Sequence, residues 1–166
     1  MKNRAFLGLI LLLGSSLFAD PAEGFWLSVD EQTGKITAGW ELFQENGKLL
    51  GRILSIAGHP QDIKASACRE SYRGFPRTGK VNELPIVGPP WIFGLSPERS
   101  AGHWRGGSVI DPNDGKIYQC RITYHPADGK RFPQDALEMR GEIGLGIGRS
   151  QFWRRSTREE ASSLRE

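Results

Sequence analysis

Short segments of alternating apolar and polar residues, separated by glycine, proline or asparagine, run through most of the chain. Alternation places the apolar side chains on one face of a strand, because successive strand residues point to opposite faces. Few stretches carry the apolar repeat that marks an amphipathic helix. The 21 glycines and 10 prolines provide turn positions throughout. Short strands at regular spacing, with turn signals between them, predict an all-β sandwich or barrel.

The segments can be assigned to strands in order along the chain. Asn46-Gly47 predicts a tight hairpin between the second and third strands, so the first three form an antiparallel meander. About eight strands close into a small antiparallel barrel that can hold one small ligand. The expected strands cover residues 24–30, 35–44, 48–57, 103–110 and 117–125, with a short edge strand in the proline-broken segment 84–95 and residues 135–140 leading into a final stretch, 139–154. The polar segment 58–83 is a long loop with room for a short helix near residues 62–71.

Glycines recur at alternate positions in the final stretch, residues 139–154. Gly144, Gly146 and Gly148 would leave one face of a strand bare and the opposite face apolar. Glycine within a strand marks a bend or a close approach by another group. We interpret this stretch as the strand that closes the barrel, with the bare face leaving volume that large neighbours fill or a ligand uses.

The first residues have the pattern of an export signal. Lys2 and Arg4 precede an apolar segment, residues 5–13, and a small residue stands before Asp20. The stretch is shorter than the roughly 20 residues that span a bilayer, so we expect a cleaved signal peptide over residues 1–19 rather than an uncleaved anchor. Its removal lowers the formal net charge from +3 to +1, which does not favour a nucleic-acid partner.

Three further expectations concern the compartment, the domain organisation and the two cysteines. The protein is expected in the periplasm or outside the cell, as one domain over residues 20–155 followed by a charged, frayed tail over 156–166. Cys68 and Cys120 form an even pair, which favours a disulfide in an oxidising compartment; two buried free thiols are the alternative.

Three motifs, in order, resemble a known family: GFWLSVD at 24–30, WRGGSVIDPNDGKIYQC at 104–120 and MRGEIGLGIGRSQFWRR at 139–155. They are similar to a family of exported bacterial proteins, domain of unknown function 2147. The resemblance covers nearly the whole chain after the signal. It implies a lipocalin-like (calycin-like) barrel and no agreed activity.

A second resemblance is to lipocalins, which carry Gly-x-Trp on their first strand and a late arginine packed across that tryptophan at the closed end. Gly24-Phe25-Trp26 is similar to the first motif, and Arg154 or Arg155 would supply the cation. The resemblance thus assigns Gly24, Trp26 and an arginine, taken as Arg154, to the barrel base. Their role there would be structural.

Motifs that carry chemistry are weak or missing in the sequence. The GLGIG run lacks the context of a dinucleotide loop, and the spacings of His59, His103 and His125 fit no compact metal motif. The DPNDGK and PADGK segments read as tight turns. Glu138 and Glu142 flank Arg140 on one strand face, which indicates a solvated ion-pair surface. We therefore expect no catalytic residue, metal or cofactor.

Aromatic residues are the better functional clue. In a small barrel they either fill the interior or line a pocket, and Trp91 beside two prolines looks like part of a rim or lid. The candidate ligand-binding residues are Trp40, Trp91, Phe93, Tyr118, Tyr124 and Arg140.

The leading hypothesis is non-catalytic binding of a small apolar or amphipathic molecule in the lumen. The alternatives are a filled barrel that acts as an interaction or envelope-structural module, and a small hydrolase or isomerase that uses barrel carboxylates. The sequence names no protein partner.

Overall fold

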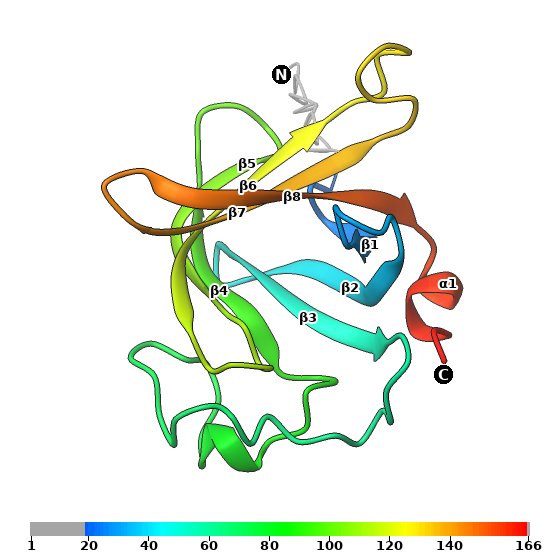
Figure 1. Ribbon diagram of the computed structural model, residues 1–166. Coiled ribbons are helices and arrows are strands. Elements are labelled where there is room, and N and C mark those ends of the chain that lie inside the picture. The colour runs from blue at the N-terminus through cyan, green and yellow to red at the C-terminus, as the bar shows by residue number, and fades with distance from the viewer. Residues whose placement is uncertain (1–18, 166) are drawn as a thin grey trace, which may run out of the picture.

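Eight antiparallel strands close into a barrel in which each strand pairs with its neighbours in sequence and β8 returns to β1 (Figure 1). The computed structural model describes residues 19–165. The strands are β1 (Gly24–Val29), β2 (Ile36–Glu45), β3 (Lys48–Ile56), β4 (Pro90–Pro97), β5 (His103–Ile110), β6 (Ile117–His125), β7 (Ala136–Gly144) and β8 (Ile147–Ser156); helical turns occur at η1 (Val81–Glu83) and α1 (Arg158–Ser162). The predicted eight-stranded barrel is confirmed. The expected signal peptide falls on residues outside the described range, except for Ala19.

The glycine-rich stretch forms a hairpin, so its interpretation as one closing strand is wrong. Leu145 and Gly146 both adopt left-handed backbone angles, with φ of 51° and 75°. Two such residues in succession reverse the chain in a two-residue turn. Gly144 pairs with Ile147 across this turn, and β8 alone makes the contact with β1 that closes the barrel.

The proline-broken segment does not form an edge strand. β4 starts at Pro90, and it pairs with β3 on one side and β5 on the other. Proline is tolerated at the first position of a strand, where its missing N–H is not needed. The closed barrel gives β4 two partners, which the local sequence does not reveal.

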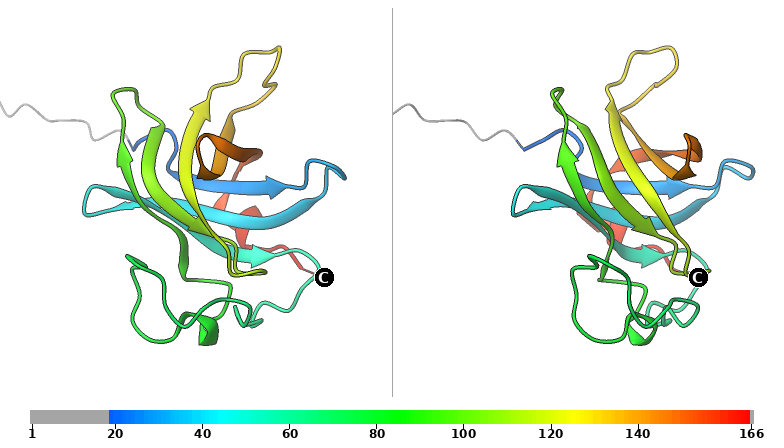
Figure 2. Two further views of the ribbon diagram at one scale, coloured as in Figure 1. Left: turned by 60° about the vertical axis from the view of Figure 1, so that its left-hand side comes forward. Right: turned by 90° about the vertical axis from the view of Figure 1, so that its left-hand side faces the viewer.

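The long loop between β3 and β4 covers the outside of β4 and lies beneath the barrel in both views of Figure 2. Phe75 packs against Trp91 and Phe93, with ring centroids 5.7 and 5.5 Å apart. The indole N–H of Trp91 donates to the carbonyl of Ile86 at 2.6 Å. Trp91 is therefore fully buried, and the prediction that it forms an exposed rim is wrong. The loop's helical turn is η1, later than the expected helix near residues 62–71.

The charged C-terminal segment is ordered, contrary to the expectation of a frayed tail. Thr157 caps α1 by accepting a hydrogen bond from the N–H of Glu160. Ala161 is fully buried, and its carbonyl accepts a hydrogen bond from Ser55 Oγ at 2.7 Å. Gly39 is needed opposite, because a Cβ there would collide with the Ala161 backbone. The helix thus docks on the outer face of β2 and β3.

The two cysteines are both buried and free, so the predicted disulfide is not formed. Cys68 lies against the turn between β5 and β6, with its Sγ 4.0 Å from the Pro112 carbonyl. Cys120 lies within β6, where it pairs with Gly107 and Gly141, and is not part of the turn that Cys68 contacts.

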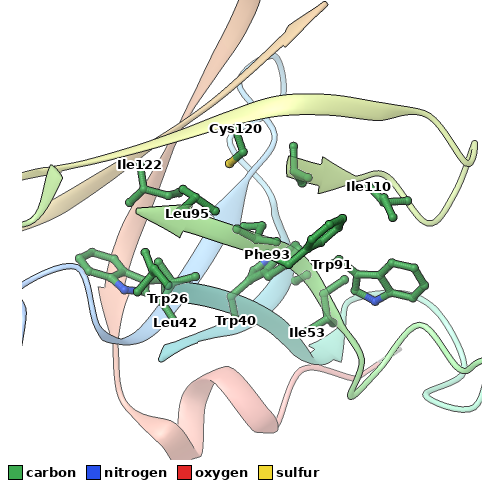
Figure 3. Close-up of a cluster of buried hydrophobic side chains, with 14 of the residues drawn as sticks. Trp26, Trp40, Leu42, Ile53, Trp91, Phe93, Leu95, Ile110, Cys120 and Ile122 are labelled. Carbon is green, nitrogen blue, oxygen red and sulfur yellow. The ribbon is translucent and has the colours of Figure 1, made fainter. Parts of the chain in front are cut away.

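The interior divides into a filled end and an end that retains space. The filled end, called the closed end below, carries the β2–β3 and β6–β7 turns. Its buried side chains include Trp26, Leu42, Leu95 and Ile122, which gather on one side of the cluster in Figure 3. The opposite end, called the open end, carries the β1–β2, β5–β6 and β7–β8 turns. Among residues 19–165, no helix is long and apolar enough to cross a membrane.

Candidate functional site

A cavity of about 490 Å³ occupies the open end of the barrel. Strands from every part of the sheet except β4 contribute to its wall, and Ile86 of the long loop adds to it. Aromatic and aliphatic side chains dominate the lining, among them Trp40, Ile53, Val109, Tyr118, Met139 and Trp153. A concave, mainly apolar space of this volume is typical of a small-molecule site.

Two tryptophans form one side of the cavity. Trp40 of β2 and Trp153 of β8 stack with their centroids 4.8 Å apart and their planes inclined by 25°. The Trp40 indole N–H donates to Ser28 Oγ at 3.2 Å, and that of Trp153 donates to Gln151 Oε1 at 3.3 Å. Because both indole donors are already satisfied by the protein, the pair offers the lumen mainly apolar surface.

Glycine leaves part of the cavity wall without side chains. The sequence predicts this for Gly144, Gly146 and Gly148, and it holds for Gly148 alone. Gly148 of β8 lines the cavity, next to Gly141 of β7. Gly144 and Gly146 belong to the hairpin turn instead. A Cβ at Gly148 would collide with the Gly141 carbonyl, whereas a Cβ at Gly141 would meet Tyr118 at 3.4 Å, an ordinary contact. Gly141 therefore borders free space in the lumen.

The mouth of the cavity carries an ion pair between two separate turns. Arg149 of β8 lies with its Nη2 3.3 Å from Glu31 Oε2 of the β1–β2 turn. Only residues 25–27 of β1 pair with β8, so this ion pair joins the two strands where their ladder has ended. Sequence reasoning missed Arg149. The sequence signal that could have identified Arg149 is its alternation with Gln151 and Trp153, because alternate strand residues share a face and all three line the cavity.

The structure brings two of the six predicted ligand-binding residues into the cavity, Trp40 and Tyr118. Trp91 and Phe93 lie on the opposite face of β4, under the long loop. Their neighbour Ile92 pairs with Val109, which lines the cavity, so alternation turns Trp91 and Phe93 outward.

The remaining two candidates, Tyr124 and Arg140, also lie away from the cavity. Tyr124 contacts Trp26 edge-on at the closed end, with centroids 6.4 Å apart. Arg140 lies on the outer face of β7, where it donates to Glu142 Oε1 at 2.7 Å and to the Gly146 carbonyl at 3.0 Å. Neither can orient a ligand in the lumen.

The barrel base is formed as the lipocalin resemblance implies, but with the other arginine. The guanidinium carbon of Arg155 lies 4.5 Å from the centroid of the Trp26 ring, and Arg155 Nη1 donates to the carbonyls of Pro21 and Glu23. Arg155 pairs directly with Trp26, so the two side chains share a face, whereas Arg154 is exposed on the outside. The assignment of Arg154 to the base is therefore wrong.

The carboxylates near the glycine stretch lie on the outer surface, as the face analysis indicated. Glu138 accepts hydrogen bonds from His125 at 3.0 Å and from Ser150 at 2.6 Å. Burial raises the pKa of Glu138, but the bonds from Ser150 and His125 outweigh it and hold the pKa below its usual value. Glu142 pairs with Arg140. Within residues 19–165, no three His, Cys, Asp or Glu side chains are grouped to hold a metal ion.

Comparisons with known proteins agree with this geometry. No curated protein sequence matches the chain. A solved structure described as "Protein HP1028 from the human pathogen Helicobacter pylori belongs to the lipocalin family" has a similar fold, with a TM-score of 0.64, 19% identity, and coverage of 84% of this chain and 85% of that one. The model of the family "Uncharacterized protein conserved in bacteria (DUF2147)" matches residues 24–155. The chain therefore belongs to the DUF2147 family and has a lipocalin-like barrel.

Proposed function

We propose that the protein binds a small apolar or amphipathic molecule in the open end of the barrel, without catalysis. The observation that carries the proposal is the cavity of about 490 Å³ walled by the stacked Trp40–Trp153 pair. Burial of apolar ligand surface would supply the affinity, at about 25 cal/mol per Å². The similar fold of the lipocalin-family structure supports the same reading.

The polar groups of the lining favour an apolar ligand. Ser28 Oγ is shared with Thr37 Oγ1 at 2.8 Å and with the Trp40 indole, and Arg149 is paired with Glu31. A ligand rich in polar groups would have to break these contacts, which makes its binding costly. An amphipathic ligand would place its polar part at the mouth, where it would compete with Glu31 for Arg149.

The two alternatives have less support. A fully filled barrel does not agree with a cavity at the open end. Catalysis by paired carboxylates lacks its pair, because Asp111 is the single carboxylate in the lining and it bonds its own turn through Asn113. We also propose that the protein is exported to the periplasm or beyond, on the basis of the signal-like residues 1–19.

Native and denaturing mass spectra of the purified protein test both proposals. A bound ligand appears as added mass in the native spectrum that is lost on denaturation. The denatured mass shows whether residues 1–19 have been removed. The apo protein is then titrated with the neutral fluorescent probe N-phenyl-1-naphthylamine. No added mass together with no probe binding would contradict the binding proposal.

A further inference from the structure

The tip of the β7–β8 hairpin gathers the most exposed large hydrophobic side chains of the described chain. Leu145 is fully exposed, Ile143 is 71% exposed and Ile147 is 62% exposed. The other large apolar residues at the surface, Ile63 and Ile117, are each only 37% exposed. In Figure 1 the hairpin, drawn in orange, projects away from the barrel. Clustered exposed apolar residues of this kind mark a contact with another molecule or a membrane.

The backbone conformation at the tip is one that leucine rarely adopts, so the turn itself does not explain the presence of Leu145. The chain contains a second two-residue hairpin turn with nearly the same geometry, Asn46-Gly47, at φ of 52° and 71° against 51° and 75° for Leu145-Gly146. Asparagine tolerates the left-handed region, whereas leucine is strained there. Leu145 is thus unfavourable both for its backbone and for its exposure to water. Such an outlier is typical of a position kept for function.

The tip is continuous with the cavity. Ile143 and Ile147 line the cavity as well as the outer surface, while Leu145 extends beyond them. An apolar path therefore leads from the lumen to the end of the hairpin. The tip is convex, since the chain reverses within two residues, and this shape suits insertion into a soft apolar medium.

Three basic side chains lie at the same end as the apolar tip, each paired with a carboxylate: Arg140 with Glu142, Arg149 with Glu31 and Lys116 with Asp114. Arg140 donates to the carbonyl of Gly146 within the turn, at 3.0 Å. Arg149 is 62% exposed, and Lys116 of the β5–β6 turn at the same end is 68% exposed. Apolar residues flanked by Arg and Lys are typical of segments that lie in the membrane interface, and anionic headgroups there would compete with Glu31 and Asp114 for the exposed Arg149 and Lys116.

We propose that the β7–β8 hairpin tip inserts into the interfacial layer of a bilayer that contains anionic phospholipids. Insertion would place the mouth of the cavity at the lipid surface. The proposal goes beyond ligand binding and stands or falls separately from it, because the surface of the tip exists whether or not the lumen is occupied.

A fluorescent label at the tip tests the proposal in the full chain. Leu145→Cys is labelled with the apolar dye NBD, and Glu45→Cys beside the β2–β3 turn serves as the matched control at the closed end. Both native cysteines are buried, and the unmodified chain measures any background labelling. The control site lies beside Gln44, which donates a hydrogen bond to Glu23 just before β1.

Vesicles of phosphatidylglycerol and phosphatidylethanolamine are added to both labelled chains. The proposal predicts a blue shift and higher emission for the label at Leu145 and no change at Glu45, with a weaker response to phosphatidylcholine vesicles. A shift at Glu45 alone, or at neither site, would overturn it. A blue shift at Leu145 that grows with protein concentration without vesicles would also overturn it, since the tip would then contact a second copy.

A second variant separates insertion from folding. Leu145→Asn recreates the Asn-Gly turn found at residues 46–47, so the hairpin is retained while the apolar tip is lost. In vesicle flotation, the lipid concentration for half-maximal binding should rise about tenfold, as expected for losing one inserted leucine. Unchanged flotation of a folded Leu145→Asn chain would contradict the proposal even if the label responds.

Discussion

Gly141 allows the lumen to be filled without disturbing the fold. It lies on β7 with its missing side chain directed at the cavity, where a Cβ would be 3.4 Å from Tyr118 Cβ and 3.8 Å from Val109 Cγ1. Its φ lies outside the left-handed region, so a side chain is compatible with the backbone. Gly141→Leu should therefore occupy the space that a ligand uses, and Gly141→Ala should leave most of it free.

The expected effects of the two variants can be estimated. A leucine side chain takes the place of about four ligand carbons, and at about 0.8 kcal/mol per buried CH₂ the loss is about 3 kcal/mol. This corresponds to roughly 200-fold weaker binding, since about 1.4 kcal/mol is tenfold. Gly141→Ala should stabilise the strand by about 0.5–1 kcal/mol. For Gly141→Leu, new burial and local crowding oppose each other, so stability should stay within about 1 kcal/mol of the wild type.

The assay is a titration with N-phenyl-1-naphthylamine, followed by its emission, for the wild type and both variants. Urea unfolding of the same samples reports stability. The reasoning predicts strong binding by the wild type and Gly141→Ala, and little binding by a folded Gly141→Leu. If Gly141→Leu is as stable as the wild type and binds the probe equally well, the probe does not enter this cavity and the reasoning is refuted.

Three further predictions concern stability. Arg155→Ala removes the cation over a buried indole and two hydrogen bonds to backbone carbonyls, and should lower the free energy of unfolding in urea by about 2 kcal/mol. The control Arg154→Ala, at an exposed position, should change it by less than about 0.5 kcal/mol. Equal effects of the two variants would contradict the assignment of Arg155 to the barrel base. Leu145→Asn should relieve backbone strain and raise stability by about 1 kcal/mol, or Tm by about 2–4 °C; a lower Tm would contradict the strained turn. Glu138 has a lowered pKa in the fold, so its stabilisation is present above its ordinary value of 4.5 and lost as pH falls through the lower folded value. Glu138→Gln should thus be less stable than the wild type at pH 7, by about 1 kcal/mol, and the difference in urea unfolding should shrink towards pH 3; a constant difference would contradict the assigned hydrogen bonds.

Much of the barrel is predictable because most strands bury one face only. In β6, Cys120 and Ile122 are buried and Gln119 and Arg121 exposed, so alternation identifies both the strand and its inner face. Asn46-Gly47 is equally informative, because asparagine and glycine are the residues that its backbone requires. Local chemistry and tertiary structure agree at these positions.

The errors arise where tertiary contacts override local patterns. β4 is buried on both faces, because the long loop covers its outside, so Trp91 and Phe93 resemble lumen residues in the sequence. The turn at Leu145 has no turn chemistry at its first position, so the hairpin reads as one strand.

Part of the candidate site could be predicted from the sequence, because alternation identifies the inner face of some of its strands. Trp40 and Tyr118 lie on strands whose alternation is clear, and both line the cavity. Met139 and Trp153 belong to the two strands that the missed turn separates, so their proximity on adjacent strands of the cavity wall could not be anticipated.

Met139 provides the most direct test of the central claim that the open end of the barrel is a ligand site. The chain has two methionines, Met1 and Met139, and Met139 lines the cavity. Methyl-¹³C-methionine labelling therefore gives at most two methyl signals by NMR, which Met139→Leu assigns. On titration with N-phenyl-1-naphthylamine, the account predicts that the Met139 signal shifts in step with the probe's fluorescence. A probe that binds by fluorescence while the Met139 signal stays unmoved would contradict it.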